Sequence, residues 1–118
     1  MVNSIIARIK QGSIKSVVLF SDSMKIPPPP YVVVKPEAGA IGGTRQFRVI
    51  VHMDRGHFIE LDQYTLTELD SLLLGGIDGE DGGRYMLYPS GYTDVTADAQ
   101  GDTYFMERTY YTPITIRR

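Results

Sequence analysis

The chain has no cysteine and no tryptophan among its 118 residues, and it has only two histidines. Without cysteine, neither a disulfide framework nor a thiolate metal site can form. The formal net charge is only −2, so no strong basic field exists to bind nucleic acid through its phosphates. The apolar runs are far too short to cross a bilayer. Residues 1–4 lack a charged segment followed by a long apolar one, which predicts that no signal peptide is present.

What the chain does contain is typical of one globular domain. Hydrophobic residues make up 42% and charged residues 22%, which argues against disorder of the whole chain. At this length a single core suffices for independent folding. We therefore expect one domain that spans residues 1–118.

Two strands form the predicted centre of the fold. The four prolines of residues 27–30 predict a stiff, extended lead-in, and the β-branched run Tyr31–Val34 predicts a buried strand that Pro36 ends. Residues 37–44 predict a glycine-containing loop. From Arg45 to Met53 apolar side chains alternate with polar ones, which indicates a second, antiparallel strand.

Two helices are predicted, one before these strands in the chain and one after them. The first covers Ser4–Gln11, with Asn3 or Ser4 as its cap. The second lies between Leu61 and Leu74, and two starts remain open, a capping box of Thr65 with Glu68 or a cap by Asp62. The expected core consists of Ile5, Ile9, Val32, Val34, Val49, Val51, Leu69 and Leu72.

The remaining segments complete the predicted order of helix, strand, strand, strand, helix, strand, strand. We expect a strand at Ser16–Phe20, an exposed acidic and glycine-rich loop at 75–83, and a strand at Arg84–Tyr88 that residues 89–91 break. The next long strand is Thr103–Tyr111, and a basic tail follows. The fold class is α+β, a mostly antiparallel sheet of about five strands with two helices packed on one face.

Motifs for chemistry are weak. His52, Asp54 and His57 are the only cluster that resembles a site, but they lack the spacing of a zinc motif, so a surface or edge position is favoured. An EF-hand loop that began at Asp78 would need a carboxylate at its twelfth position, where Pro89 stands. No P-loop and no nucleophile context is present. We therefore expect no enzyme activity, no cofactor and no bound metal.

Tyrosine is concentrated in the last third of the chain. Tyrosines on strands stack on bases in some RNA-binding sheets, but few basic residues lie between these. Tyrosine is also enriched at protein–protein interfaces, and we favour this reading. Tyr104, Arg108 and Tyr110 share one face of the Thr103–Tyr111 strand. Together with Tyr31 and Arg48 they are the predicted subunit interface.

Taken as a whole, the order and lengths of the segments resemble the small tail-terminator and tail-completion proteins of long-tailed bacteriophages. The resemblance covers nearly the whole chain and is a pattern of elements rather than a catalytic signature. It rests on the helix Ser4–Gln11, the Pro30–Val34 strand, the charged strand Arg45–His52, the helix end Glu68–Leu73 and the closing segment Asp102–Pro113.

The resemblance implies a ring, usually of six copies, at the head-proximal end of the tail tube. Such a ring ends tube polymerisation and provides the surface to which a filled head docks. The implied partners are other copies of the chain, the major tail tube protein and the head-side neck proteins. DNA passes through such a ring without sequence-specific recognition, and no membrane is involved. The implied location is the virion, with assembly in the host cytoplasm.

Two alternatives remain. A head-side adaptor or stopper of the same neck is the nearest, and a small protein-binding module with no viral role is the other.

Overall fold

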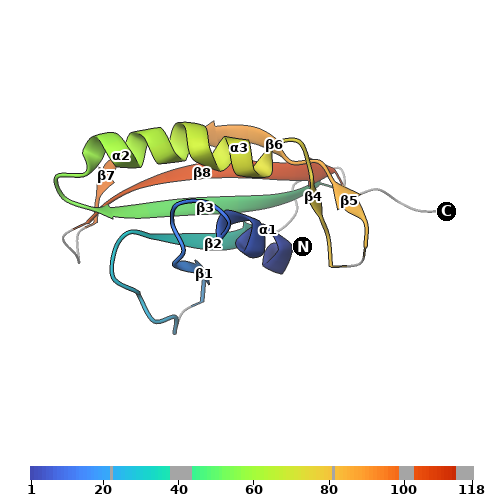
Figure 1. Ribbon diagram of the computed structural model, residues 1–118, viewed down its shortest axis with the longest axis horizontal. Helices are drawn as coiled ribbons and strands as arrows, with labels where there is room; N and C mark the ends of the chain where they lie inside the picture. Colours follow the sequence, from blue (N-terminus) through green and yellow to red (C-terminus); the bar gives the residue numbers. More distant parts are fainter. Residues whose placement is uncertain (22, 38–43, 81, 99–102, 114–118) are drawn as a thin grey trace.

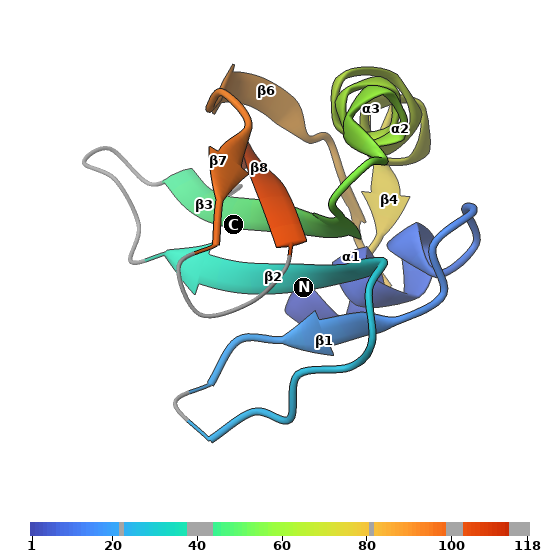
Figure 2. The ribbon, with the colours of Figure 1, turned by 90° about the vertical axis from the view of Figure 1, so that its left-hand side faces the viewer.

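The computed structural model describes residues 1–21, 23–37, 44–80, 82–98 and 103–113. Figure 1 shows a twisted sheet with helices along one side, and Figure 2 views the same arrangement end-on. The elements are α1 (Val2–Ile9), β1 (Val17–Leu19), β2 (Tyr31–Glu37), β3 (Thr44–Asp54), α2 (Phe58–Gln63), η1 (Tyr64–Glu68), α3 (Leu69–Leu73), β4 (Ile77–Asp78), β5 (Arg84–Tyr85), β6 (Tyr88–Tyr92), β7 (Thr96–Ala97) and β8 (Thr103–Pro113).

The main sheet has the strand order β1-β2-β3-β8-β6, and the short β7 also pairs with β8. Strand β1 runs parallel to β2, whereas the pairs β2–β3, β3–β8, β6–β8 and β7–β8 are antiparallel. Strands β4 and β5 form a separate two-stranded sheet. The predicted α+β fold, with a mostly antiparallel sheet and helices on one face, is confirmed.

The central strand β3 follows the predicted alternation. Phe47, Val49 and Val51 are buried, and they join the core that the helices cover. The residues between them, such as Arg48 and Ile50, are half-buried and point to the opposite face. Of the eight expected core residues, all are buried except Leu72, which is half-buried and packs against the core.

Helix α1 begins at Val2, earlier than predicted, and its cap position is Met1, which makes no side-chain capping bond. The predicted caps Asn3 and Ser4 both lie inside the helix, so that prediction is wrong. Ile5 and Ile9 are fully buried, as expected for an amphipathic helix that docks on a sheet.

The second helix runs without interruption from Phe58 to Leu73 and is wound as a π-helix over its middle part, η1. Both predicted starts are therefore wrong, because Asp62 and Thr65 both lie inside the helix. The carboxylate of Glu68 also makes no capping bond to Thr65. The Glu68 carboxylate accepts hydrogen bonds from the backbone N–H and the hydroxyl of Ser13. Gly75, at φ 96°, supports the predicted helix end, because only glycine adopts this φ readily.

Two strand predictions and the prediction for the proline segment need correction. Pro36 does not end β2, because β1 pairs only as far as Val34 and leaves proline on an unpaired side. The predicted strand Arg84–Tyr88 is divided between β5 and β6, and residues 89–91 do not break β6, an edge strand that contains a bulge between Pro89 and Gly91. Residues 28–30 form a bend, so the four prolines are not the extended lead-in that the sequence predicts. The Pro29–Pro30 peptide bond is cis.

The acidic segment 75–83 is only partly the exposed loop that was predicted. It contains β4, whose Ile77 is 4% exposed and belongs to the core, and β4 pairs with β5. The loop predicted at 37–44 and the tail at 114–118 lie largely or wholly outside the described residues.

Candidate interaction surfaces

The predicted interface on β8 is tied into the subunit by Asp70 of α3. The Arg108 guanidinium donates to both Asp70 carboxylate oxygens, at 3.2 and 2.9 Å, and the Tyr110 hydroxyl donates to Oδ1 at 2.7 Å. Burial, and then the neighbouring Asp70, raises the pKa of the Tyr110 phenol well above its ordinary value. This cluster joins the central sheet to the second helix.

Two of the five predicted interface residues are inaccessible in the subunit. Tyr110 is 0% exposed and Tyr31 is 3% exposed, so the expectation that they form a contact surface is wrong. Period-2 alternation placed Tyr104, Arg108 and Tyr110 on one face correctly, but that face is the one the helices cover. Tyr104 and Arg108 are half-buried on it.

On the opposite face of the sheet, aromatic rings cross three adjacent strands. The His52 ring stacks on Tyr31, with centroids 4.4 Å apart and an interplanar angle of 9°, and lies 5.3 Å from the Phe105 ring. Burial lowers the pKa of His52, and the nearby Asp98 carboxylate opposes this effect in part. His52 is thus a packed sheet residue that favours its neutral form.

Arg48, the fifth predicted interface residue, lies on this same opposite face. Its guanidinium is 3.2 Å from a Glu37 carboxylate oxygen and 3.5 Å from one of Glu107. The side chain is 37% exposed, so it remains reachable from solvent while it bridges β2, β3 and β8. Its charge is balanced within the subunit, which suits cross-strand pairing.

The other residues of the weak histidine cluster do not assemble around His52. His57 precedes α2 and is 3.7 Å from Glu60, with both side chains more than half exposed. Within the described ranges, no three metal-ligating side chains of His, Cys, Asp or Glu stand together. Within the same ranges, no helix is both long and apolar enough to span a bilayer.

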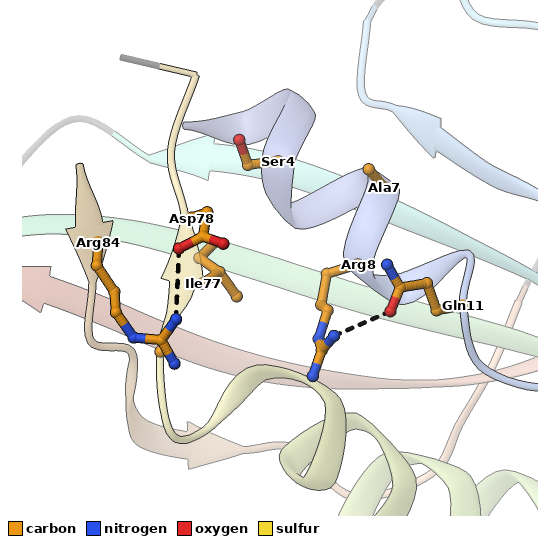
Figure 3. Close-up of a pocket in the computed structure, with 8 residues that line it drawn as sticks. Ser4, Ala7, Arg8, Gln11, Ile77, Asp78 and Arg84 are labelled. Atoms are coloured by element: carbon orange, nitrogen blue, oxygen red, sulfur yellow. Dashed lines mark hydrogen bonds and ion pairs between the residues drawn. The ribbon is translucent and has the colours of Figure 1, made fainter. Parts of the chain in front are cut away.

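A polar groove of about 420 Å³ separates α1 from the β4–β5 hairpin. Figure 3 shows Arg8 on the α1 side of the groove and Ile77, Asp78 and Arg84 on the hairpin side. Arg8 donates to Gln11 Oε1 and to the Leu72 carbonyl, and Arg84 donates to Asp78 and to the Gly75 carbonyl. These bonds hold the hairpin and the helix end in place, and the lining residues include no nucleophile paired with a base.

Exposed apolar side chains occur at the two opposite margins of the sheet, on both of its faces. We define the β1-edge patch as Leu19, Phe20 and Ile26, with exposures of 44%, 39% and 65%. The β6-edge patch consists of Met86, Tyr88 and Tyr92, with exposures of 43%, 41% and 59%. Strands β1 and β6 lie at opposite ends of the sheet in both views (Figures 1 and 2).

A third group of exposed apolar residues is a pair at the start of α2, where Phe58 is 53% and Ile59 is 67% exposed. Single exposed apolar residues are ordinary, but grouped ones mark contact sites. Sequence reasoning missed the β1-edge patch, because Leu19 and Phe20 had the pattern of a strand and nothing marked that strand as an edge. It singled out the tyrosine-rich third but not Tyr88 and Tyr92 as its exposed members.

No family model matches the chain, and no curated protein matches it. Among solved structures, one chain whose name states no function matches with a TM-score of 0.65 at 16% sequence identity. The alignment covers 98% of this chain and 91% of the other. At this identity the likeness shows that the α+β fold occurs in a solved protein of similar length.

Proposed function

We propose that the protein is a ring-forming subunit of a bacteriophage neck, located at the head-proximal end of the tail tube. In this role it ends tube polymerisation and provides the surface to which a filled head docks. The proposal starts from the whole-chain resemblance to tail-terminator proteins. The segments on which that resemblance rests correspond in chain order to α1, β2, β3, the end of the second helix and β8.

The observation that carries the proposal is the position of the two edge patches. A closed ring needs heterologous contacts, in which one surface of a subunit meets a different surface of its neighbour. A two-fold dimer needs only one patch that meets itself. The β1-edge and β6-edge patches differ in composition and lie at opposite margins of the sheet, which suits a ring.

The proposed role is structural and requires no catalysis. A tube adds identical rings through one repeated contact, so nothing in that contact limits its length. A capping ring stops growth by covering the exposed end of the tube with a surface that the tube protein cannot extend. The cap must therefore bind the last tube ring more tightly than another tube ring does.

The test is electron microscopy of particles assembled without this protein. The proposal predicts tubes that overgrow or are unstable, together with filled heads that remain unjoined. Normal tails that still join wild-type heads would contradict it. Normal tails beside leaking heads would instead identify the head-side adaptor.

A further inference from the structure

We infer that β1 of one copy pairs with β6 of the next copy, so that the sheet continues from subunit to subunit. This inference rests on the proposed ring and names the contact that builds it. The occupant of each edge is thus a second copy of the chain. Four features of the two edges agree with this pairing.

The first feature is the direction of backbone groups at β1. The Ser16 carbonyl accepts a hydrogen bond from Val32 N–H, and Phe20 N–H donates to the Val34 carbonyl, each at 2.9 Å. Ser16 and Phe20 therefore face β2. Because successive residues of a strand present their backbone groups to opposite sides, Leu19 presents its N–H and C=O outward.

The second feature is the matching direction at β6. Thr93 N–H donates to the Glu107 carbonyl at 3.0 Å, so Thr93 faces β8 and Tyr92 faces outward. Strand β6 is antiparallel to β8, and the pairings β8–β3, β3–β2 and β2–β1 make it antiparallel to β1 as well. When a second copy is placed beside the first so that the sheet continues, its β6 therefore runs antiparallel to β1 of the first copy.

The third feature is the side-chain face. Leu19 is the register partner of Val34, a core residue under the helices. Tyr92 is the register partner of Arg108, which binds Asp70 of α3. Both side chains therefore lie on the helix-covered face, as cross-strand partners in one continuous sheet must.

The fourth feature is complementarity in the register that pairs Leu19 with Tyr92. That register puts Phe20 opposite Gly91, and a Cβ built on Gly91 has no neighbour within 4 Å, so the phenylalanine ring has room. It also brings Lys15, before β1, near Asp94, after β6. Both are exposed and carry opposite charges.

Cysteine cross-linking tests the pairing, because the chain has no cysteine of its own. A hydrogen-bonded antiparallel pair places the two Cα atoms about 5.5 Å apart, within the range of about 4.4–6.8 Å that a disulfide spans. Purified full-length chain carrying Leu19→Cys together with Tyr92→Cys should form a ladder of oligomers on oxidation. The control pair, Leu19→Cys with Thr67→Cys at an exposed position of η1, should remain monomeric on a denaturing gel.

A second variant tests the contact without a cross-link. Gly91→Leu adds a side chain where the isolated subunit has space, so the fold and its melting temperature should be kept. In the paired edges the leucine would meet Phe20 of the next copy, so self-association measured by sedimentation should fall at least tenfold. Adding Phe20→Ala should restore part of that loss.

Failure of this contact is distinguishable from failure of the proposed function. Rings of wild-type size without the 19–92 cross-link, or dimers cross-linked by Leu19→Cys alone, would overturn the edge pairing. So would unchanged association of Gly91→Leu, or a chain that stays monomeric. None of these results depends on tail length, which separately tests the role in the neck.

Discussion

The Tyr110 hydroxyl donates a 2.7 Å hydrogen bond to the Asp70 carboxylate, which joins β8 to α3 in the interior of the subunit. Asp70 also accepts both bonds from Arg108. The Arg108 guanidinium lies 5.7 Å from the Tyr92 ring centroid, so the same cluster reaches the β6-edge patch. Arg108 and Tyr110, which the sequence predicts to be interface residues, therefore connect the sheet to the second helix within the subunit.

Replacing Tyr110 tests this internal role. Tyr110→Phe keeps the ring but leaves Asp70 without one donor, and bonds to charged groups contribute about 1.5–3 kcal/mol. Tyr110→Ala also leaves a cavity and should cost about 3–5 kcal/mol of unfolding free energy. Urea denaturation measures both. A loss below about 0.5 kcal/mol in Tyr110→Ala, within the range of ordinary surface changes, would contradict the burial of this ring.

The same geometry changes how interface variants must be designed. Because Tyr110 is fully buried and Arg108 is paired with Asp70, changing Tyr104, Arg108 and Tyr110 together to Ala should destabilise the subunit and would not isolate an effect on association. Tyr92→Ala, on the exposed edge, is the cleaner substitution.

The face of the second helix is tested by two leucines one turn apart. Leu69 is fully buried, so Leu69→Ala should cost about 2–5 kcal/mol. Leu72 is half-buried beside Gly12, so Leu72→Ala should cost clearly less. Equal losses in chemical denaturation would mean that the helix is rotated relative to the sheet.

Stability should depend on the protonation of His52. Its pKa is lowered in the folded state from the ordinary 6.5, chiefly by burial, so the unfolded chain binds the proton more tightly. The stabilisation is therefore complete above pH 6.5 and is lost as the pH falls from there toward the folded pKa. His52→Gln should flatten this part of the stability profile. The opposite slope would contradict the assignment.

Hydrogen exchange tests the hairpin at 75–83. The amide of Gly79 donates to the Gly83 carbonyl at 2.7 Å, and that of Gly82 donates to the Gly79 carbonyl at 3.1 Å. Both amides should exchange more slowly than a random coil in the isolated subunit, yet much faster than Val49 in the central strand. Random-coil rates at Gly79 and Gly82 would show that the hairpin is not formed.

The sequence predicted the fold better than it predicted the surfaces. Alternation along Phe47, Val49 and Val51 determines a strand face whatever surrounds it, and Gly75 marks a helix end by its conformational freedom. Neither pattern states which face of the sheet the helices cover. For that reason the pattern alone predicts an exposed Tyr110.

Edges were harder still to predict. Whether β1 and β6 are terminal strands depends on pairings between residues distant in the chain, such as Val32 with Val51 and Tyr92 with Arg108. Local propensity carries no information about these pairings. The proline and glycine in β6 therefore predict a break, although an edge strand tolerates both.

The most direct measurement of the central claim is tube assembly from purified major tail tube protein, with and without this chain. The account predicts that added chain stops growth, so that tube length falls as its concentration rises and a ring is visible by electron microscopy at one end only. Gly91→Leu, which the proposed edge pairing predicts to be defective in ring formation, serves as the control and should leave the tubes long. Tubes whose length and ends do not change when wild-type chain is added would contradict the account.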